Sequence, residues 1–292
     1  MSELTTLDVA WLAANPLPDF DGVVDKSQRG QALIVGGSPS SPAAPMLTAE
    51  AALRAGCGRV RIGVAAAMVP SIATALPEAG YIPLAVDGTG AIDADAADLL
   101  ADSAVRTDAI AIGPGMGDRA SAARLVEALI AAAPDMPFLL DAAACACADP
   151  LGERIAGHPG HVVLTPHPGE MAALTGRHLE DVMRDCAGAT IDAARRFDAI
   201  VALRSTETWI AAPDGRLLHY PGGGVGLATG GSGDVGVGII LGLLARGADP
   251  FRAAAWGTWV HGEAGRRLGA PGFLAREILP LIRDLIRRPL AV

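Results

Sequence analysis

Short, largely apolar runs alternate with alanine-rich segments from about residue 31 to the end of the chain. Continuous apolar runs of this length are typical of strands that are buried on both faces of a sheet. We expect strands over 31–35, 59–64, 109–112, 138–141, 162–164, 200–203, 208–212 and 216–219. We expect helices over 44–55, 121–132, 233–245, 250–268 and 276–287.

This alternation predicts an α/β fold with a mostly parallel central sheet and helices on both faces. The turn signal Asp214-Gly215 adds an antiparallel hairpin within 208–219. No linker or repeat interrupts the pattern, so we expect an N-terminal arm at 1–25 and a single domain over 26–292. In such sheets ligands bind beyond the carboxyl ends of the strands, which makes the turns after the strands the places to search for chemistry.

The composition excludes some classes of function. Hydrophobic residues make up 51% of the 292, enough for a large core, and the scarcity of aromatics (4%) suits helices on a sheet better than a β-sandwich. The net charge of −9 and the lack of a Lys/Arg cluster argue against a nucleic-acid binder. An acidic protein can still bind a phosphate compound locally, through backbone N–H groups and a metal ion.

Cysteine usage and the N-terminal sequence predict a cytoplasmic protein. The four cysteines form no Cys-x-x-Cys pair, so we expect reduced, buried thiols at Cys57, Cys145, Cys147 and Cys186. Residues 1–20 lack the features of a secretory signal. The longest apolar run, near 237–245, is far shorter than the roughly 20 residues that span a bilayer, so we expect no membrane partner.

One turn concentrates the candidate chemistry: Thr229-Gly230-Gly231-Ser232-Gly233-Asp234, which runs into an apolar helix. The free N–H groups and the dipole of a helix start attract anions, and glycines let the backbone approach a phosphate closely. Asp234 would repel that anion. It is therefore either a residue that favours a helix start or a base that takes a proton from a hydroxyl beside the phosphate.

Two familiar nucleotide motifs are excluded. Gly231, Gly233 and Gly236 match G-x-G-x-x-G, but they lie in the final third of the chain and only helices follow. A dinucleotide-binding fingerprint belongs to an early βαβ unit, so a Rossmann dehydrogenase does not fit. No G-x-x-x-x-G-K-[ST] occurs either, which excludes a P-loop enzyme.

Three further turns follow predicted strands: 36–38 (Gly-Gly-Ser), 113–117 (Gly-Pro-Gly-Met-Gly) and 165–170 (Thr-Pro-His-Pro-Gly-Glu). Either glycine turn would serve tight packing or a ligand. His167, held between two prolines, would be a ligand contact or an exposed loop residue. Four such strand exits in one sheet are hard to explain by packing alone.

In this order and at this spacing, these segments resemble the ADP- or ATP-dependent NAD(P)H-hydrate dehydratase family, a branch of the ribokinase-like superfamily. The resemblance covers nearly the whole chain, through 33–38 with 49–58, then 111–117, 165–170 and 228–242. It implies a three-layer ribokinase-like fold and repair of damaged cofactor. A hydrated nicotinamide ring is phosphorylated on its new hydroxyl by ADP or ATP with Mg²⁺, and phosphate then leaves to restore NADH or NADPH.

The resemblance also implies residue roles. Asp234 would be the base that activates the hydroxyl and would contact the substrate. The anion hole would comprise Gly230, Gly231, Ser232 and Gly233. The hydrated dinucleotide would be contacted by Ala44, Gly115, Gly117 and His167. The AMP part of the nucleotide would be held by Arg204, Ser205, Thr206, Glu207, Thr208 and Gly233.

Three segments depart from the family pattern, and at the first of them Ala43 replaces a glycine and Pro45 a small residue. Arg204-Ser205-Thr206 stands where the family usually has Lys-Gly-Ala, and 141–146 reads Asp-Ala-Ala-Ala-Cys-Ala where the family has Asp-Ala-Asp-Ala-Leu-Asn. These departures leave two alternatives open: a kinase of the same superfamily with another hydroxyl substrate, and a non-catalytic nucleotide-binding relative. No metal-ligating residue is assigned, and we expect a homo-oligomer.

Overall fold

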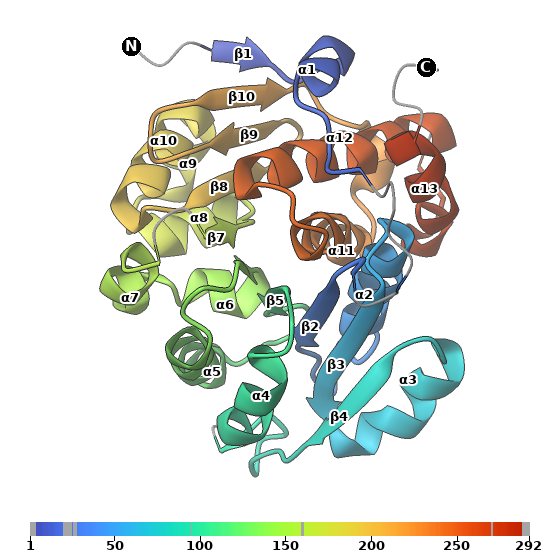
Figure 1. Ribbon diagram of the computed structural model, residues 1–292. Helices are drawn as coiled ribbons and strands as arrows, with labels where there is room; N and C mark the ends of the chain where they lie inside the picture. The colour runs from blue at the N-terminus through green and yellow to red at the C-terminus, as the bar shows by residue number, and fades with distance from the viewer. Residues whose placement is uncertain are drawn as a thin grey trace.

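The computed structural model describes residues 4–19, 25, 28–93, 95–158, 161–269 and 271–287. Within these residues the strands are β1 (Leu4–Thr6), β2 (Gln31–Val35), β3 (Arg59–Ala65), β4 (Gly80–Leu84), β5 (Ala109–Ile112), β6 (Phe138–Leu140), β7 (Val162–Leu164), β8 (Ile200–Arg204), β9 (Thr208–Ala211) and β10 (Leu217–Tyr220). They form one sheet in the order β1-β10-β9-β8-β7-β6-β5-β2-β3-β4 (Figure 1). Neighbouring strands are parallel except at β8–β9 and β9–β10. The expected parallel sheet with an antiparallel hairpin is thus confirmed.

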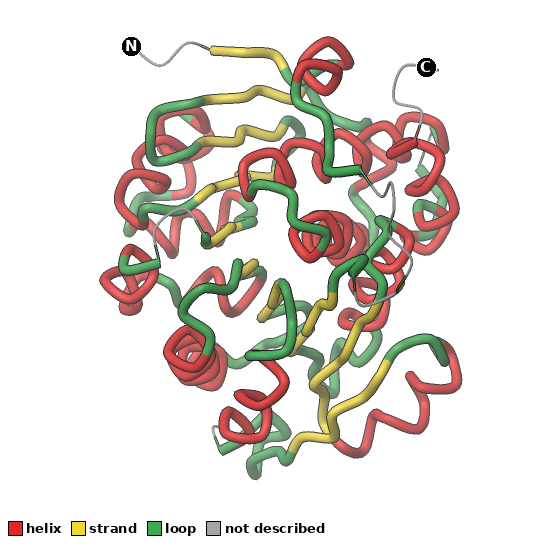
Figure 2. The backbone as a smooth tube through the Cα atoms, viewed as in Figure 1, coloured by secondary structure: helices red, strands yellow, loops and turns green. Residues whose placement is uncertain are grey.

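Helices cover both faces of this sheet. Their bounds are α1 (Val9–Ala14), α2 (Ala44–Arg54), α3 (Val69–Ala75), α4 (Ala96–Ala104), α5 (Arg119–Ala132), α6 (Ala142–Ala146), α7 (Gly152–Ala156), α8 (Pro168–Thr175), α9 (Leu179–Arg184), α10 (Cys186–Phe197), α11 (Ser232–Ala245), α12 (Pro250–Leu268) and α13 (Leu279–Arg287). Figures 1 and 2 show α2, α11, α12 and α13 on one side and α4 to α10 on the other. Among the described residues, no helix combines the length and apolar character that crossing a membrane requires.

The sequence explains why the sheet is covered twice. Along β2, Ala32 and Ile34 pack into one apolar cluster, whereas Leu33 and Val35 pack into the other. Because successive side chains of a strand point to opposite faces, a continuously apolar strand needs a helix layer on each side. The three-layer architecture follows.

Some elements differ from the expectation. β4 was missed because Gly80 and Pro83 weaken the strand pattern, yet an edge strand tolerates proline. The last helix begins at Leu279 rather than 276, since Glu277 caps the backbone of Leu274 in a preceding 3₁₀ turn. Cys186 is half-buried and not buried, while the other three thiols are buried as expected.

The parallel strands place the predicted turns at one edge of the sheet. β2, β5, β6, β7 and β8 all run in the same direction, so the residues after each strand meet at their carboxyl ends. The first turn of α11 completes this edge, because α11 packs against α2, whose first residues follow β2. The candidate site is built there.

Candidate active site

The start of α11 offers unpaired amide groups. Gly231 precedes the helix with φ +85°, a conformation that glycine adopts without strain, and a Cβ there would come within 2.7 Å of Leu47. The amide of Ser232 donates to the carbonyl of Thr229, and that of Val235 donates to Gly231. Among the described residues, the amides of Gly233 and Asp234 have no acceptor, as expected for a helix start that receives an anion.

Asp234 is the third residue of α11, and its carboxylate caps nothing. The helix has no side-chain cap, and the side chain of Asp234 is half-buried. The pKa of Asp234 is raised to about 6, because burial and the nearby charge of Asp141 raise it more than the cation of Arg204 lowers it. Asp234 therefore does not act as a side-chain cap, and its role as a base stays a prediction.

A clamp of three side chains lies beside Asp234. Asp141 follows β6, Thr165 follows β7 and Arg204 ends β8. The guanidinium of Arg204 donates to the carboxylate of Asp141 and to the carbonyls of Thr165 and Gly233. The hydroxyl of Thr165 donates to the same oxygen of Asp141 at 2.8 Å. The departing segments 141–146 and 204–206 thus meet at one point.

The structure adds one residue to the site that the sequence interpretation missed. His261 of α12 lies 2.9 Å, through Nε2, from the hydroxyl of Ser232 in the predicted anion hole. Burial lowers the pKa of His261 to about 4, and the cation of Arg204 adds to the effect, so the imidazole is neutral at pH 7. In the sequence His261 is a lone histidine inside a long helix, with no turn or glycine signal beside it.

His167 lies at the start of α8. Its Nδ1 accepts the amides of Gly169 and Glu170, and the carboxylate of Glu170 accepts the amide of His167 in return. Burial raises the pKa of Glu170. The His167 side chain is 60% exposed, so it remains free to contact a ligand.

A cavity of about 590 Å³ opens beside the start of α11. Its walls include Tyr220, Val225, Leu227 and Ile240, apolar surface of the kind that holds a nucleobase. Seven of the predicted site residues line it: His167, Arg204, Ser205, Thr206, Thr208, Ser232 and Gly233. Ser232 and Gly233 of the predicted anion hole therefore share one cavity with most of the predicted nucleotide segment, whereas Gly230, Gly231 and Asp234 are not part of its lining.

Other predicted residues lie outside that cavity. Glu207 points instead to His219, whose Nε2 is 2.7 Å from its carboxylate. Gly115 adjoins Ala44, since a Cβ at Gly115 would come within 2.7 Å of the Ala44 Cβ. Ala44 is linked to Asp234 through Thr48, whose hydroxyl lies 3.1 Å from the carbonyl oxygens of both. Gly117 lines a separate hollow of about 300 Å³ between the turns after β2 and β5.

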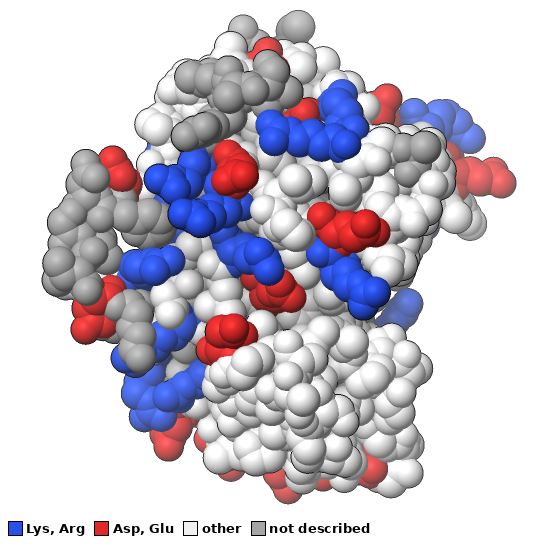
Figure 3. All heavy atoms as spheres, turned by 90° about the vertical axis from the view of Figure 1, so that its right-hand side faces the viewer, with Lys and Arg blue, Asp and Glu red and all other residues white. Residues whose placement is uncertain are grey.

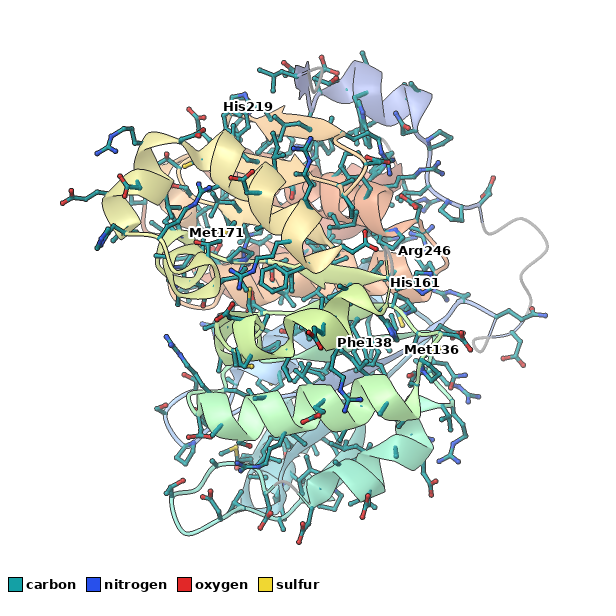
Figure 4. All side chains as sticks on the ribbon, turned by 90° about the vertical axis from the view of Figure 1, so that its left-hand side faces the viewer. Met136, Phe138, His161, Met171, His219 and Arg246 are labelled. Atoms are coloured by element: carbon teal, nitrogen blue, oxygen red, sulfur yellow. The ribbon has the colours of Figure 1, made fainter. Side chains whose placement is uncertain are left out.

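A third hollow, of about 530 Å³, lies at the opposite edge of the sheet. Its lining includes Asp108, Met136, His161 and Arg246, which precede β5, β6 and β7 or end α11. Figure 4 shows Met136, His161 and Arg246 gathered at that edge. Because none of the predicted turns reaches it, this hollow is not the candidate active site.

The comparisons with known proteins agree with this geometry. A profile of the NAD(P)H-hydrate dehydratase family matches residues 32–282. A protein of Xanthomonas campestris pv. campestris, the ADP-dependent (S)-NAD(P)H-hydrate dehydratase, is 42% identical over 289 residues, which cover 97% of this chain and 96% of the relative. The chain belongs to the NAD(P)H-hydrate dehydratase family.

Solved structures place the family in its wider fold class. The ADP/ATP-dependent NAD(P)H-hydrate dehydratase of Bacillus subtilis, co-crystallised with ATP and Mg²⁺, superposes with a TM-score of 0.79 at 27% identity, covering 99% of each chain. A ribokinase-like superfamily protein of Enterococcus faecalis gives a TM-score of 0.81 at 23% identity, with 98% of this chain and 96% of that chain covered. The three-layer ribokinase-like fold expected for the hydrate dehydratase family is confirmed.

Proposed function

We propose that this chain is an ADP-dependent (S)-NAD(P)H-hydrate dehydratase, which repairs hydrated NADH and NADPH. One observation carries the proposal: the unpaired amides of Gly233 and of Asp234 itself lie at one helix start, and Gly233 lines the same cavity as Arg204, Ser205 and Thr206. A base and an anion site at one helix start are what phosphoryl transfer to a hydroxyl requires.

The chemistry follows from this placement. Asp234 takes the proton of the ring hydroxyl while the hydroxyl oxygen forms a bond to the terminal phosphorus of ADP. The bond from that phosphorus to the bridging oxygen breaks, and AMP leaves. Phosphate then leaves the ring together with a proton from the adjacent carbon, which restores the double bond. The unpaired amides at this helix start, those of Gly233 and Asp234, stabilise the charge on the transferred group.

The predicted binding residues fall into two groups, one for the nucleotide and one for the hydrated dinucleotide. The segment Arg204–Thr208 with Gly233 holds the AMP part of the nucleotide, and the apolar cavity wall receives its base. Ala44, Gly115, Gly117 and His167 contact the hydrated dinucleotide. Support for Gly115 and Ala44 comes from the contacts that run from Gly115 to Ala44 and, through Thr48, to the backbone of Asp234.

Mg²⁺ enters this proposal with the nucleotide. The described residues contain no group of three or more His, Cys, Asp or Glu side chains arranged to hold a metal ion. Mg²⁺ commonly keeps several waters and binds through substrate phosphates rather than in a protein cage. Mg²⁺ bound to the phosphate oxygens of the nucleotide and to water would need no such group of side chains, and it would neutralise charge on the phosphates.

We also propose that the chain forms a homo-oligomer in the cytoplasm. The segment 62–77, which includes α3, carries no charged residue, and Figure 3 shows the resulting uncharged face. Its exposed positions are mostly alanine and proline, a surface that a second copy of the chain would cover. Light scattering would show a mass above 29.6 kDa for the purified chain, and a monomer would contradict the proposal.

Asp234→Asn tests the proposed reaction. Purified protein receives hydrated NADH, Mg²⁺ and ADP or ATP, and the absorbance of the reduced nicotinamide is followed. We expect the wild type to restore it and Asp234→Asn to lose turnover while still binding the nucleotide. No recovery by the wild type with either nucleotide would contradict the function, and full activity of Asp234→Asn would remove Asp234 from the mechanism.

A further inference from the structure

Arg204 is bound on all three nitrogens of its guanidinium. Nε and Nη2 donate to the carbonyl of Thr165 at 3.1 and 2.8 Å, and Nη1 donates to the carbonyl of Gly233 at 3.1 Å. Nη2 also donates to Asp141, which is 7% exposed against 25% for Arg204. This side chain joins three strand ends to the first turn of α11, and most of its donors are used before any ligand arrives.

We propose that Arg204 is a positioning residue, which holds the backbone of Gly233 at the anion site and, paired with Asp141, fixes the balance of charge beside Asp234. The inference rests on the proposed function, because it assigns Asp234 the task of taking the hydroxyl proton. It gives Arg204 a role beyond contact with the nucleotide.

The contacts require the shape of arginine. A planar fork reaches two carbonyls and a carboxylate at once, whereas the ammonium of lysine is a single point on a flexible stem. Lysine at this position would keep the positive charge but could not hold Thr165 and Gly233 together. A Cβ built on Gly233 would lie 3.3 Å from Nη1 of Arg204, so the guanidinium packs closely against the start of α11.

The charges around Asp234 come from several elements. Asp141 after β6 and Arg204 of β8 act on Asp234 directly and with opposite sign. Glu170 of α8 interacts with both of them and with His167, and the neutral His261 of α12 lies near Arg204. From α2 the contact is Thr48, which is uncharged. The Asp141–Arg204 pair therefore contains one charge that raises the proton affinity of Asp234 and one that lowers it.

Two substitutions separate the two charges. Asp141→Asn removes the anion, leaves Arg204 as the neighbouring charge and should lower the titration midpoint of Asp234. Arg204→Gln removes the cation and should raise the midpoint. Each shift should be about one pH unit, in keeping with a charge at short range. Arg204→Lys keeps the cation and should leave the midpoint near that of the wild type.

The midpoint is measured without turnover. Carbon-13 NMR of protein labelled at aspartate carboxyls gives the titration of Asp234, whose signal is assigned as the one missing from Asp234→Asn. The exposed pair Arg177 and Asp192 supplies matched controls, Arg177→Gln and Asp192→Asn, which should not move that signal. If Asp141→Asn and Arg204→Gln both leave the midpoint unchanged, or both shift it in the same direction, the proposed opposing effects of Asp141 and Arg204 on Asp234 are wrong.

Turnover tests the positioning role. Arg204→Lys should lower kcat by roughly tenfold to hundredfold, because a misplaced anion site no longer aligns the transferred group. Wild-type kcat in Arg204→Lys would overturn this role. The two proposals fail separately: a wild type that does not restore NADH contradicts the function, whereas the NMR midpoints decide the charge pair whatever the substrate.

Discussion

At the residue scale, the proposed reaction depends on the environment of Asp234. A carboxylate with an ordinary pKa is a weak base at neutral pH, and one with a strongly raised pKa would be protonated there. Burial beside Asp141 brings the pKa of Asp234 to about 6, while Arg204 keeps it from rising further. The side chain is therefore mostly ionised at pH 7 and still has useful affinity for a proton.

This value predicts the acid side of the pH profile. Because Asp234 must be ionised to accept the hydroxyl proton, kcat/KM for the hydrate should fall as the pH decreases through about 6, approaching tenfold per unit below it. Initial rates between pH 5 and 8 measure this, with nucleotide binding followed over the same series as a control. A profile that stays flat to pH 5 would contradict the assignment of Asp234 as the base.

The same burial predicts a cost in stability. The folded-state pKa of Asp234 lies above its ordinary value of 3.8, so folding favours the protonated form and the ionised form destabilises the protein above about pH 6. Asp234→Asn should thus raise the free energy of unfolding at pH 8 by on the order of 1–3 kcal/mol. The gain should shrink towards pH 4. Urea unfolding at both pH values measures it, and an equal effect at each pH would contradict the argument.

Some residues of the candidate site could be predicted from the sequence, and others could not. Asp234 and its glycines stand in a local motif with a physical signature, so they could be predicted. The clamp could not, because Asp141 and Arg204 are 63 positions apart and only the sheet order brings them together. His261 carries no local signal, and its contact with Ser232 depends on how α12 packs on α11.

At the element scale, close packing of α11 on α2 fixes the site. A Cβ on Gly238 would stand 2.2 Å from the carbonyl oxygen of Thr48, and one on Gly242 would stand 2.6 Å from that of Ala52. These glycines let the two helices approach closely enough for the hydroxyl of Thr48 to reach the backbone of Asp234. The helix start that carries the base is thus tied to the turn after β2.

Gly238→Ala tests this packing. The added methyl must push α11 away from α2, and overpacking of this kind costs about 1–3 kcal/mol. Gly236→Ala, two residues earlier on the same helix, is the matched control. A Cβ there meets His261 at an ordinary 3.5 Å, so this change should be neutral or slightly stabilising. Chemical denaturation of both variants decides, and equal stabilities would refute the close contact.

Elements with strong periodicity were predictable. The strands 31–35, 109–112 and 162–164 and the helix 250–268 have the predicted bounds. Asp249 caps the start of α12, with Pro250 in its first turn, and Gly269 follows its end, all local signals. β1 is exposed along its length and is held by pairing with β10, a partner more than 200 positions away, so no apolar pattern marked it.

At the scale of the whole molecule, the layered architecture was predictable because it depends on pattern rather than on particular contacts. Alternation of apolar strands with helices requires a sheet covered on both faces, whatever the order of the strands within that sheet. The division into an arm at 1–25 and a domain over 26–292 stays a prediction. The substrate could be inferred only through the family, since no single residue of the site specifies a hydrated nicotinamide.

In the proposed reaction, ADP donates its terminal phosphoryl group to the hydrate, which then loses phosphate. The most direct measurement is the ratio of products when hydrated NADH is incubated with the wild-type chain, ADP and Mg²⁺. We expect one AMP and one phosphate for each NADH restored, and none of the three with Asp234→Asn. NADH restored without AMP, or AMP formed without NADH, would contradict it.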